Sequence, residues 1–259
     1  MLVLIYLVLC FSCSDKKEAP TLFLQNNVIQ LAPPRITASS TIIDSTVIVK
    51  AELKMDGVSI RYTDNGEIPT EKSELYKGDL KLSKARNYKF KAFHKDWEPS
   101  EVSEIQLFDK GQKPKAFLLQ TSASEIYPGQ GLNTLFNNKK GSLAFRDVQW
   151  MGYDTISVMI SDFKAETNIK KLTIGYLTDT KSWIFPPESV SIIVNNKDSI
   201  TVSIPTLSEG EYKALSSVKI PINKNVETVK VSVKNSILPS WHPGNGNSAW
   251  LFMDEWIFN

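Results

Sequence analysis

The stretch Thr46–Leu53, TVIVKAEL, and the next apolar stretch, Val58–Thr63, VSIRYT, carry the pattern that decides the fold. Both are short and rich in β-branched residues, and apolar and polar positions partly alternate along them. Alternation with a period of two is typical of a strand that buries one face. No window of the chain offers a convincing apolar stripe at helical spacing with capping residues. These stretches therefore predict an all-β fold with few, short helices.

Runs of the same kind continue through the rest of the chain. In the first half they are Leu75–Leu82, Asn87–His94 and Val102–Phe108. In the second half they are Leu143–Gln149, Thr155–Ser161, Lys170–Leu177, Ser189–Val194, Ile200–Ile204, Val218–Ile222, Val226–Lys234 and Ala249–Phe258. So many strands in the second half favour a two-sheet jelly roll.

A polar segment, Lys110–Lys115 (KGQKPK), separates the two sets of strands. Because Gly and Pro interrupt regular structure, we expect a domain boundary here, with one domain at residues 35–109 and a second at residues 110–259. Residues 14–34 have no sustained periodicity and end in Ala32, Pro33 and Pro34, which indicates a tether.

The charge of the chain is nearly balanced. Thirty Lys and Arg stand against 28 Asp and Glu in 259 residues, which gives a formal net charge of +2. Such a balance creates no global field that would attract a polyanion. We therefore expect no nucleic-acid partner.

Both cysteines lie in the N-terminal stretch MLVLIYLVLCFSC, as Cys10 and Cys13. The rest of the chain therefore has no intramolecular disulfide and no thiolate site. The apolar run is too short to span a bilayer but suits a secretory signal, which predicts a signal peptide at residues 1–12.

Cys13 follows the small residue Ser12 and precedes the polar run Ser14–Glu18, SDKKE. This arrangement resembles a bacterial lipoprotein signal, in particular that of surface-exported Bacteroidetes lipoproteins. The resemblance implies lipidation of Cys13, with residues 13–34 as lipidated cysteine and tether, on an outer-membrane protein exposed at the cell surface. The lipid would be its sole contact with the membrane. The alternatives are an ordinary cleaved signal or a strand of the fold.

In the first domain the informative string is Ile60–Tyr76, IRYTDNGEIPTEKSELY, followed by Tyr88–Phe93, YKFKAF. Asn65 and Gly66 can take the positive φ angles of a tight turn, and Pro69 stiffens the exit. The pattern resembles the Ig-like domain at the C-terminus of chitobiases and β-hexosaminidases. That resemblance implies an Ig-like or fibronectin III-like β-sandwich whose motif residues serve the fold.

Three strings mark the second domain: Gly141–Tyr153 (GSLAFRDVQWMGY), Ser182–Pro187 (SWIFPP) and Leu238–Glu255 (LPSWHPGNGNSAWLFMDE). Together they resemble a discoidin-type domain (coagulation factor 5/8 type C) of the kind attached to bacterial β-hexosaminidases. The predicted fold class is thus all-β, with an Ig-like sandwich followed by a discoidin-type β jelly roll.

The chain offers no evident catalytic centre. It is too short for these domains plus the (β/α)8 barrel of a hexosaminidase. Asp254 and Glu255 are the one adjacent acidic pair, and in a regular strand they would point to opposite faces. His94 and His242 lie in no metal-binding or triad motif. We therefore expect that the protein is not an enzyme.

The discoidin resemblance implies a structural Ca²⁺ site, with Asn137, Ser142 and Glu255 as side-chain ligands. Calcium takes six to eight oxygen ligands, several of them backbone carbonyls. Asn137 stands where relatives carry Asp, and Lys139 and Lys140 are close in sequence, so we expect weak affinity. The alternative is that Glu255 pairs with one of these two lysines.

The best binding candidates lie in the loop with Trp241 and His242, which is rich in Pro and Gly and carries Asn245 and Asn247 as hydrogen-bonding residues. An aromatic face is the usual platform for a sugar ring, whereas Trp150 and Trp250 in strand-like runs are expected to pack in the core.

The sequence therefore predicts a noncatalytic, glycan-binding lipoprotein that recognises N-acetylhexosamine-containing or other polysaccharides. The alternatives are a structural module that docks onto a glycosidase or an envelope protein, and the split non-catalytic tail of a β-N-acetylhexosaminidase.

Overall fold

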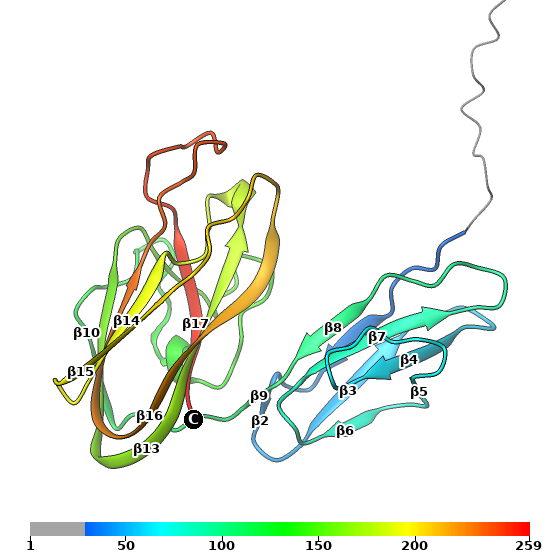
Figure 1. Ribbon diagram of the computed structural model, residues 1–259, viewed down its shortest axis with the longest axis horizontal. Coiled ribbons are helices and arrows are strands. Elements are labelled where there is room, and N and C mark those ends of the chain that lie inside the picture. The colour runs from blue at the N-terminus through cyan, green and yellow to red at the C-terminus, as the bar shows by residue number, and fades with distance from the viewer. Residues whose placement is uncertain (1–28) are drawn as a thin grey trace, which may run out of the picture.

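The computed structural model describes residues 29–259, and the all-β prediction is confirmed for this part of the chain. Two β-sandwiches contain nearly all of the regular structure, and the two helices are single 3-10 turns (Figure 1). No helix among the described residues has the length and apolarity needed to cross a membrane. The predicted signal peptide, Cys13 and most of the tether lie outside the described residues.

Two antiparallel sheets form the first sandwich. One has the order β1 (Arg35–Ala38), β3 (Val47–Glu52), β6 (Leu80–Leu82), and the other has the order β5 (Glu74–Leu75), β4 (Ser59–Thr63), β7 (Asn87–Phe93), β8 (Ser103–Gln106). Buried and exposed residues alternate strictly along β3, as its sequence predicts. Its buried face packs on Phe90 and Leu107 in one core.

The predicted strand Leu75–Leu82 is wrong, because the chain crosses from one sheet to the other inside it. Leu75 belongs to β5 and Leu80 to β6, and the backbone turns between them at Gly78, with φ +144°. The Tyr76 hydroxyl anchors the crossing by accepting a 3.1 Å hydrogen bond from the Ala51 amide. A short apolar run can therefore resemble one strand in sequence even though its two ends belong to different sheets.

In the second sandwich the sheet order is β12, β17, β13, β16, β14, β15, and β10 pairs with β13. The bounds are β10 (Ala116–Leu119), β12 (Met151–Tyr153), β13 (Ser157–Asp179), β14 (Ser189–Val194), β15 (Asp198–Ser203), β16 (Lys213–Lys234) and β17 (Leu251–Phe258). β2 (Ile42–Ile43), β9 (Phe108–Asp109), β11 (Gly129–Leu132) and the 3-10 turns η1 (Asn133–Phe136) and η2 (Thr180–Ser182) complete the regular structure.

Two pairs of predicted strands merge into the long strands β13 and β16, which pair with each other over most of their length. Their register shifts twice, between Asp162 and Thr167 and between Ile169 and Lys171. Lys164 and Asn223 take positive φ angles near these irregular stretches. The paired strands curve together at the lower end of the domain in Figure 1, so each continues where the sequence suggests a break.

The predicted strand Leu143–Gln149 is also wrong, because this segment is a loop of turns. Asp147 holds the loop closed, since its carboxylate accepts hydrogen bonds from the Ser142 amide (3.0 Å) and the Gln149 amide (3.0 Å). The carbonyl of Ser142 accepts the indole N–H of Trp150 at 2.9 Å. These local bonds replace strand pairing.

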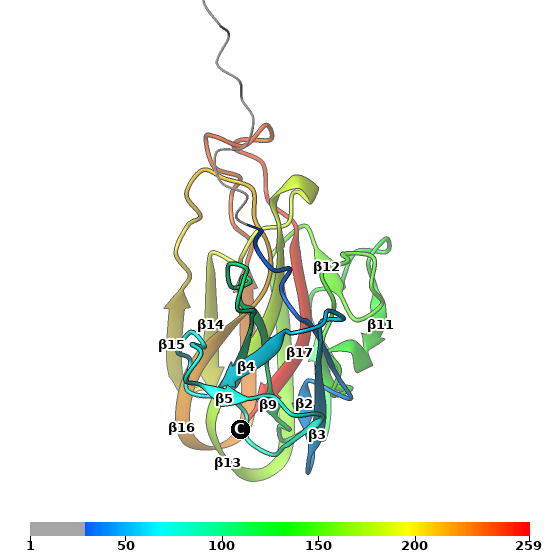
Figure 2. The same ribbon diagram turned by 90° about the vertical axis from the view of Figure 1, so that its right-hand side faces the viewer.

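The loops that follow β13 and β16 lie at the same end of the second sandwich. Both views place η2 and the long loop between β16 and β17 at the end opposite the carboxyl terminus (Figures 1 and 2). The loop from Lys234 to Leu251 carries Trp241 and His242. The fold thus brings the SWIFPP and PSWHPG strings together, although they are far apart in sequence.

Candidate functional site

A hollow of about 440 Å³ opens at this loop end of the second sandwich. Three segments line it: η2 with the residue that follows it, the loop before β16, and the loop between β16 and β17. The lining residues are Thr180, Lys181, Trp183, Glu209, Gly210, Glu211, Trp241, His242 and Pro243. The site therefore combines two indoles with charged and hydroxyl groups.

Trp183 is the exposed aromatic residue of the hollow. It ends η2 in the left-handed conformation, with φ +64°, and its amide donates a 3.1 Å hydrogen bond to the Thr180 carbonyl. Its carbonyl accepts the Trp250 amide at 2.9 Å. The backbone is therefore fixed on both sides, while the side chain stays 42% exposed.

One side of the Trp183 indole is covered by Gly244. A Cβ on Gly244 would come within 2.5 Å of a ring carbon of Trp183, so a side chain at this position would displace the indole. The His242 ring also meets the Trp183 ring edge to face, with centroids 5.3 Å apart. These contacts hold the indole in place and leave its remaining surface to solvent.

His242 is buried, and both of its ring nitrogens are occupied within the protein. Nδ1 accepts a 3.1 Å hydrogen bond from the Gly244 amide, so the neutral ring carries its proton on Nε2 and donates to the Thr180 carbonyl, 3.1 Å away. The ring therefore links the β16–β17 loop to η2. In this arrangement His242 positions the aromatic groups and has no free nitrogen for a ligand.

The other predicted loop residues differ in their placement. Trp241 is half-buried and packs against a small apolar cluster that contains Phe185 and Leu238, while part of it lines the hollow. Asn247 donates its side-chain amide to the Gly244 carbonyl at 2.9 Å and so stabilises the turn. Asn245 is exposed, and neither asparagine lines the hollow.

Charged side chains form the rim of the hollow. The Lys181 ammonium pairs with the Glu211 carboxylate at 2.8 Å, and both side chains are largely exposed. Glu209 lies two residues before Glu211 in the same loop. This loop is tied to η2 because the Tyr212 amide donates to the Thr180 hydroxyl at 3.0 Å.

Sequence reasoning missed Trp183 and the rim of Glu209 and Glu211. Trp183 lies in the motif SWIFPP, which predicts apolar packing, and its exposure depends on the left-handed turn that ends η2. The polar string Ser208–Glu211, SEGE, between two strands was a usable signal for a loop, but its place beside Trp241 depends on the sheet order.

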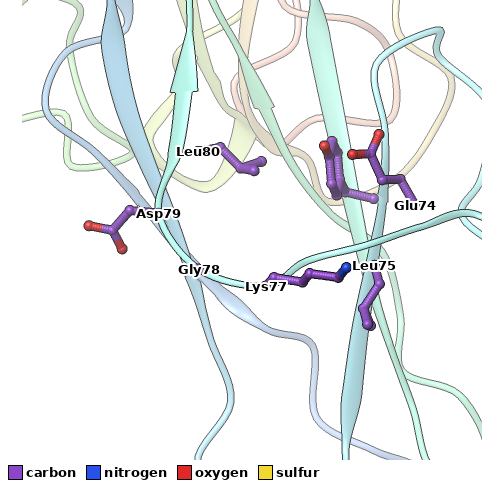
Figure 3. Close-up of a pocket in the computed structure, with 7 residues that line it drawn as sticks. Glu74, Leu75, Lys77, Gly78, Asp79 and Leu80 are labelled. Atoms are coloured by element: carbon purple, nitrogen blue, oxygen red, sulfur yellow. The ribbon is translucent and has the colours of Figure 1, made fainter.

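A second hollow, of about 470 Å³, lies on the first sandwich (Figure 3). Figure 3 shows the Asp79 side chain pointing away from Glu74, Lys77 and Leu80, and Asp79 pairs with Lys50 at 3.0 Å. Tyr62 lines this hollow but stacks on Phe90 in the core, and burial together with Glu74 raises the pKa of Tyr62 to about 12. Its one aromatic residue belongs to the core of the first sandwich, whereas the loop hollow has two indoles, so we favour the loop site.

Of the residues of the implied calcium site, Asn137 lies beside Glu255, whereas Ser142 bonds to Asp147 and Trp150, and the groups that face Glu255 are donors. The Glu255 carboxylate accepts backbone N–H groups of Asn137 and Asn138, each at 2.9 Å. The Asn137 amide donates to Gln149 at 2.7 Å and accepts the Lys139 amide at 2.9 Å. No cluster of three or more His, Cys, Asp or Glu suited to a metal occurs among residues 29–259.

This arrangement does not fit the oxygen shell that calcium requires. Burial raises the pKa of Glu255 to about 8, with Asp254 adding to the shift and the Asn138 and Asn137 amides and Lys140 opposing it. The alternative from the sequence, in which Lys139 or Lys140 pairs with Glu255, is not what the structure shows, because Lys140 pairs with Asp254. The calcium site stays a prediction of the discoidin resemblance alone.

The expectation that Asp254 and Glu255 point to opposite faces is wrong. Between β13 and β17, Ile174 pairs with Trp256 and Tyr176 pairs with Met253, so two residues of β17 face the single residue Gly175. This is a β-bulge, and a bulge turns consecutive side chains toward the same side. Both carboxylates therefore reach the loop of residues 137–141.

Comparison with curated protein sequences finds no match to this chain. Among solved structures, CpGH89CBM32-4 of Clostridium perfringens, in complex with GlcNAc-α-1,4-galactose, is 12% identical, with 56% of this chain and 90% of that chain covered at a TM-score of 0.33. The carbohydrate-binding module of AlyQ, in complex with 4,5-unsaturated mannuronic acid, is 13% identical, with 57% and 95% covered at a TM-score of 0.33.

A SusE-like protein is similar over more of the chain. It is 9% identical, with 85% of this chain and 96% of that chain covered at a TM-score of 0.30.

The family comparison concerns the first sandwich. Residues 38–104 match the profile described as the chitobiase/beta-hexosaminidase C-terminal domain. The match includes the string Ile60–Tyr76, which forms β4, the turn at Gly66 and β5. Gly66 takes a positive φ of +87°, as the motif predicts, whereas Asn65 does not. The first sandwich is thus similar in sequence to the chitobiase/beta-hexosaminidase C-terminal domain over residues 38–104.

Proposed function

We propose that this protein is a noncatalytic carbohydrate-binding module that takes a glycan in the hollow between η2 and the β16–β17 loop. The observation that carries the proposal is the Trp183 indole, which is fixed by its neighbours yet 42% exposed in a hollow with a charged rim. A rigid aromatic face costs little conformational entropy on binding, and the apolar face of a sugar ring can stack on it.

Each group in the hollow has a distinct role in this proposal. Trp183 stacks on the sugar ring, and Trp241 forms a second aromatic wall. Lys181 donates hydrogen bonds to sugar hydroxyls, while Glu209 and Glu211 accept them. His242 contacts no sugar but fixes both indoles, because its ring packs edge to face against Trp183 and Trp241.

A binding role is favoured over hydrolysis by the state of the carboxylates. Hydrolysis of a glycosidic bond uses two carboxyl groups that flank the bond. In the hollow, Glu209 and Glu211 come from one loop two residues apart, and Glu211 is exposed and engaged by Lys181. Asp254 and Glu255 are buried beneath the loop of residues 137–141, where no substrate reaches them.

The lipid anchor at Cys13 and the surface location remain part of this proposal, since an anchored glycan-binding protein would hold polysaccharide at the cell.

Docking onto another protein is the second candidate function. Ile126 and Val148 line another hollow of the second sandwich, of about 450 Å³, and both are exposed apolar side chains, as is Leu143 in the loop that carries Val148. Exposed apolar residues that gather on one surface often mark a protein interface. A glycosidase or envelope protein would be the partner in this case.

A glycan array probed with the full chain separates the two candidates. The carbohydrate proposal predicts binding to a defined set of glycans, lost in Trp183→Ala and kept in Ile126→Ala. The docking candidate predicts no glycan signal, together with co-purification of a glycosidase that Ile126→Ala weakens. An array without binding would reject the carbohydrate proposal.

A further inference from the structure

The bulge in β17 places one cation beside two buried carboxyl groups. Gly175 of β13 faces both Asp254 and Glu255, and its missing side chain leaves room for the Lys140 ammonium. A Cβ on Gly175 would overlap both Lys140 Nζ and Asp254 Oδ1. The glycine, the bulge and the lysine therefore form one packing unit.

Lys140 and the next residue, Gly141, make three contacts that anchor this part of the loop. Its ammonium forms an ion pair with Asp254, and the two side chains are only 12% and 1% exposed. The next residue, Gly141, donates its amide to the second oxygen of Asp254 at 2.9 Å. The ammonium also lies 5.3 Å from the ring centre of Phe108 in β9, which gives a cation–π contact across the domain junction.

We infer that the Lys140 ammonium is a built-in cation that takes the place of a bound metal ion between the loop of residues 137–141 and β17. The buried Asp254 carboxylate needs a counter-charge, because an unpaired buried charge is strongly destabilising, and the Lys140 ammonium supplies it. Glu255 needs no second cation, because burial favours its protonated form and its oxygen accepts the Asn137 and Asn138 amides. The loop is thus fixed to β17 from within the chain, without an added ion.

The first test compares thermal denaturation of the full chain in millimolar CaCl2, in millimolar MgCl2 and in chelator. We expect one midpoint in all three solutions, because a ligand raises the midpoint only when it binds the native state. A midpoint that rises in calcium and not in magnesium would overturn the inference.

The second test removes the charge. Lys140→Met keeps an aliphatic side chain but leaves Asp254 buried without its cation, so we expect the midpoint to fall by more than about 5 °C. Lys139→Met is the matched control, because Lys139 is exposed, and its midpoint should not change. A Lys140→Met midpoint equal to that of the wild type would also overturn the inference.

A double variant covers the case in which Lys140→Met does not fold. Lys140→Met with Asp254→Asn carries neither charge, so we expect it to be more stable than Lys140→Met alone. A double variant that is no more stable, or that also fails to fold, would mean that the loss does not come from an unpaired carboxylate.

Discussion

Trp183 and Trp150 contain the same indole in opposite environments. Trp183 is 42% exposed at the hollow, whereas Trp150 is 2% exposed and packs in a cluster with Leu177, Ile184 and Phe252. The difference arises from the backbone, since Trp183 follows a left-handed turn and Trp150 directly precedes β12.

Alanine substitution should separate these two roles. We expect Trp150→Ala to lower the free energy of unfolding by about 3–5 kcal/mol, because it empties a buried site. Trp183→Ala should change it by less than about 1 kcal/mol, because the lost contacts are partly solvated. Urea denaturation of both variants measures the difference, and equal losses would show that Trp183 is a core residue.

Glu255 gives the protein a pH-dependent stability. Its pKa is raised from an ordinary 4.5 to about 8 in the folded state, mainly by burial. Above pH 4.5 the Glu255 side chain of the unfolded protein has lost its proton, while that of the folded protein keeps it up to about pH 8. The contribution of Glu255 to stability therefore falls as the pH rises from about 4.5 to about 8.

Glu255→Gln should remove that dependence while keeping an oxygen that accepts the Asn137 and Asn138 amides. Relative to the variant, the wild type should lose roughly 2–4 kcal/mol between pH 5 and pH 8.5. Denaturant titrations at several pH values test this, with Glu227→Gln as an exposed control. Parallel profiles for the wild type and Glu255→Gln would contradict a raised pKa.

At the scale of single residues, sequence reasoning predicts side-chain type better than side-chain partners. The burial of Trp150 and the loop position of Trp241 follow from the strings around them. The partners of Glu255 do not, because a one-residue bulge in β17 redirects the side chain and carries no sequence signature of its own.

The β-bulge in β17 positions Asp254 beside Lys140, and Gly175 leaves the space that both side chains occupy. Gly175→Ala would place a methyl group against Lys140 Nζ and Asp254 Oδ1. Because overpacking displaces side chains or backbone, we expect a loss of about 1–3 kcal/mol in the free energy of unfolding, measured with urea. A neutral Gly175→Ala would mean that Lys140 and Asp254 lie elsewhere in solution.

At the scale of elements, the apolar texture locates strands but not their ends or partners. Ser189–Val194 is a strand with the predicted bounds, and its buried residues alternate with more exposed ones. Leu143–Gln149 has a similar texture but forms turns, because Asp147 captures backbone amides within the loop. Such local side-chain bonds compete with strand pairing and are not visible in hydrophobic periodicity.

At the scale of the whole molecule, two sandwiches follow one another along the chain, and each has its own apolar core. The all-β class follows from strand texture, since alternation is a property of each segment. The loop site could not be predicted from strand texture, because Trp183, Glu209 and Trp241 come from three loops that the sheet order brings together.

The attachment of the whole molecule to a membrane is tested by Cys13→Ala. If Cys13 carries the lipid, the wild type should partition into the detergent phase and the variant into the aqueous phase, because removal of the acyl chains removes the buried methylene groups that bind the bilayer. An unmodified Cys13 found by mass spectrometry, or a variant that stays in the detergent phase, would refute the anchor.

The central claim is that the hollow at Trp183 binds carbohydrate, and isothermal titration calorimetry tests it most directly. An oligosaccharide selected on the array is titrated into the wild type, Trp183→Ala and Ile126→Ala. By analogy with base–aromatic stacking, loss of the Trp183 indole should weaken binding by about 1–3 kcal/mol, while Ile126→Ala should bind as the wild type does. Equal affinities for the wild type and Trp183→Ala, or no heat of binding to the wild type, would contradict the account.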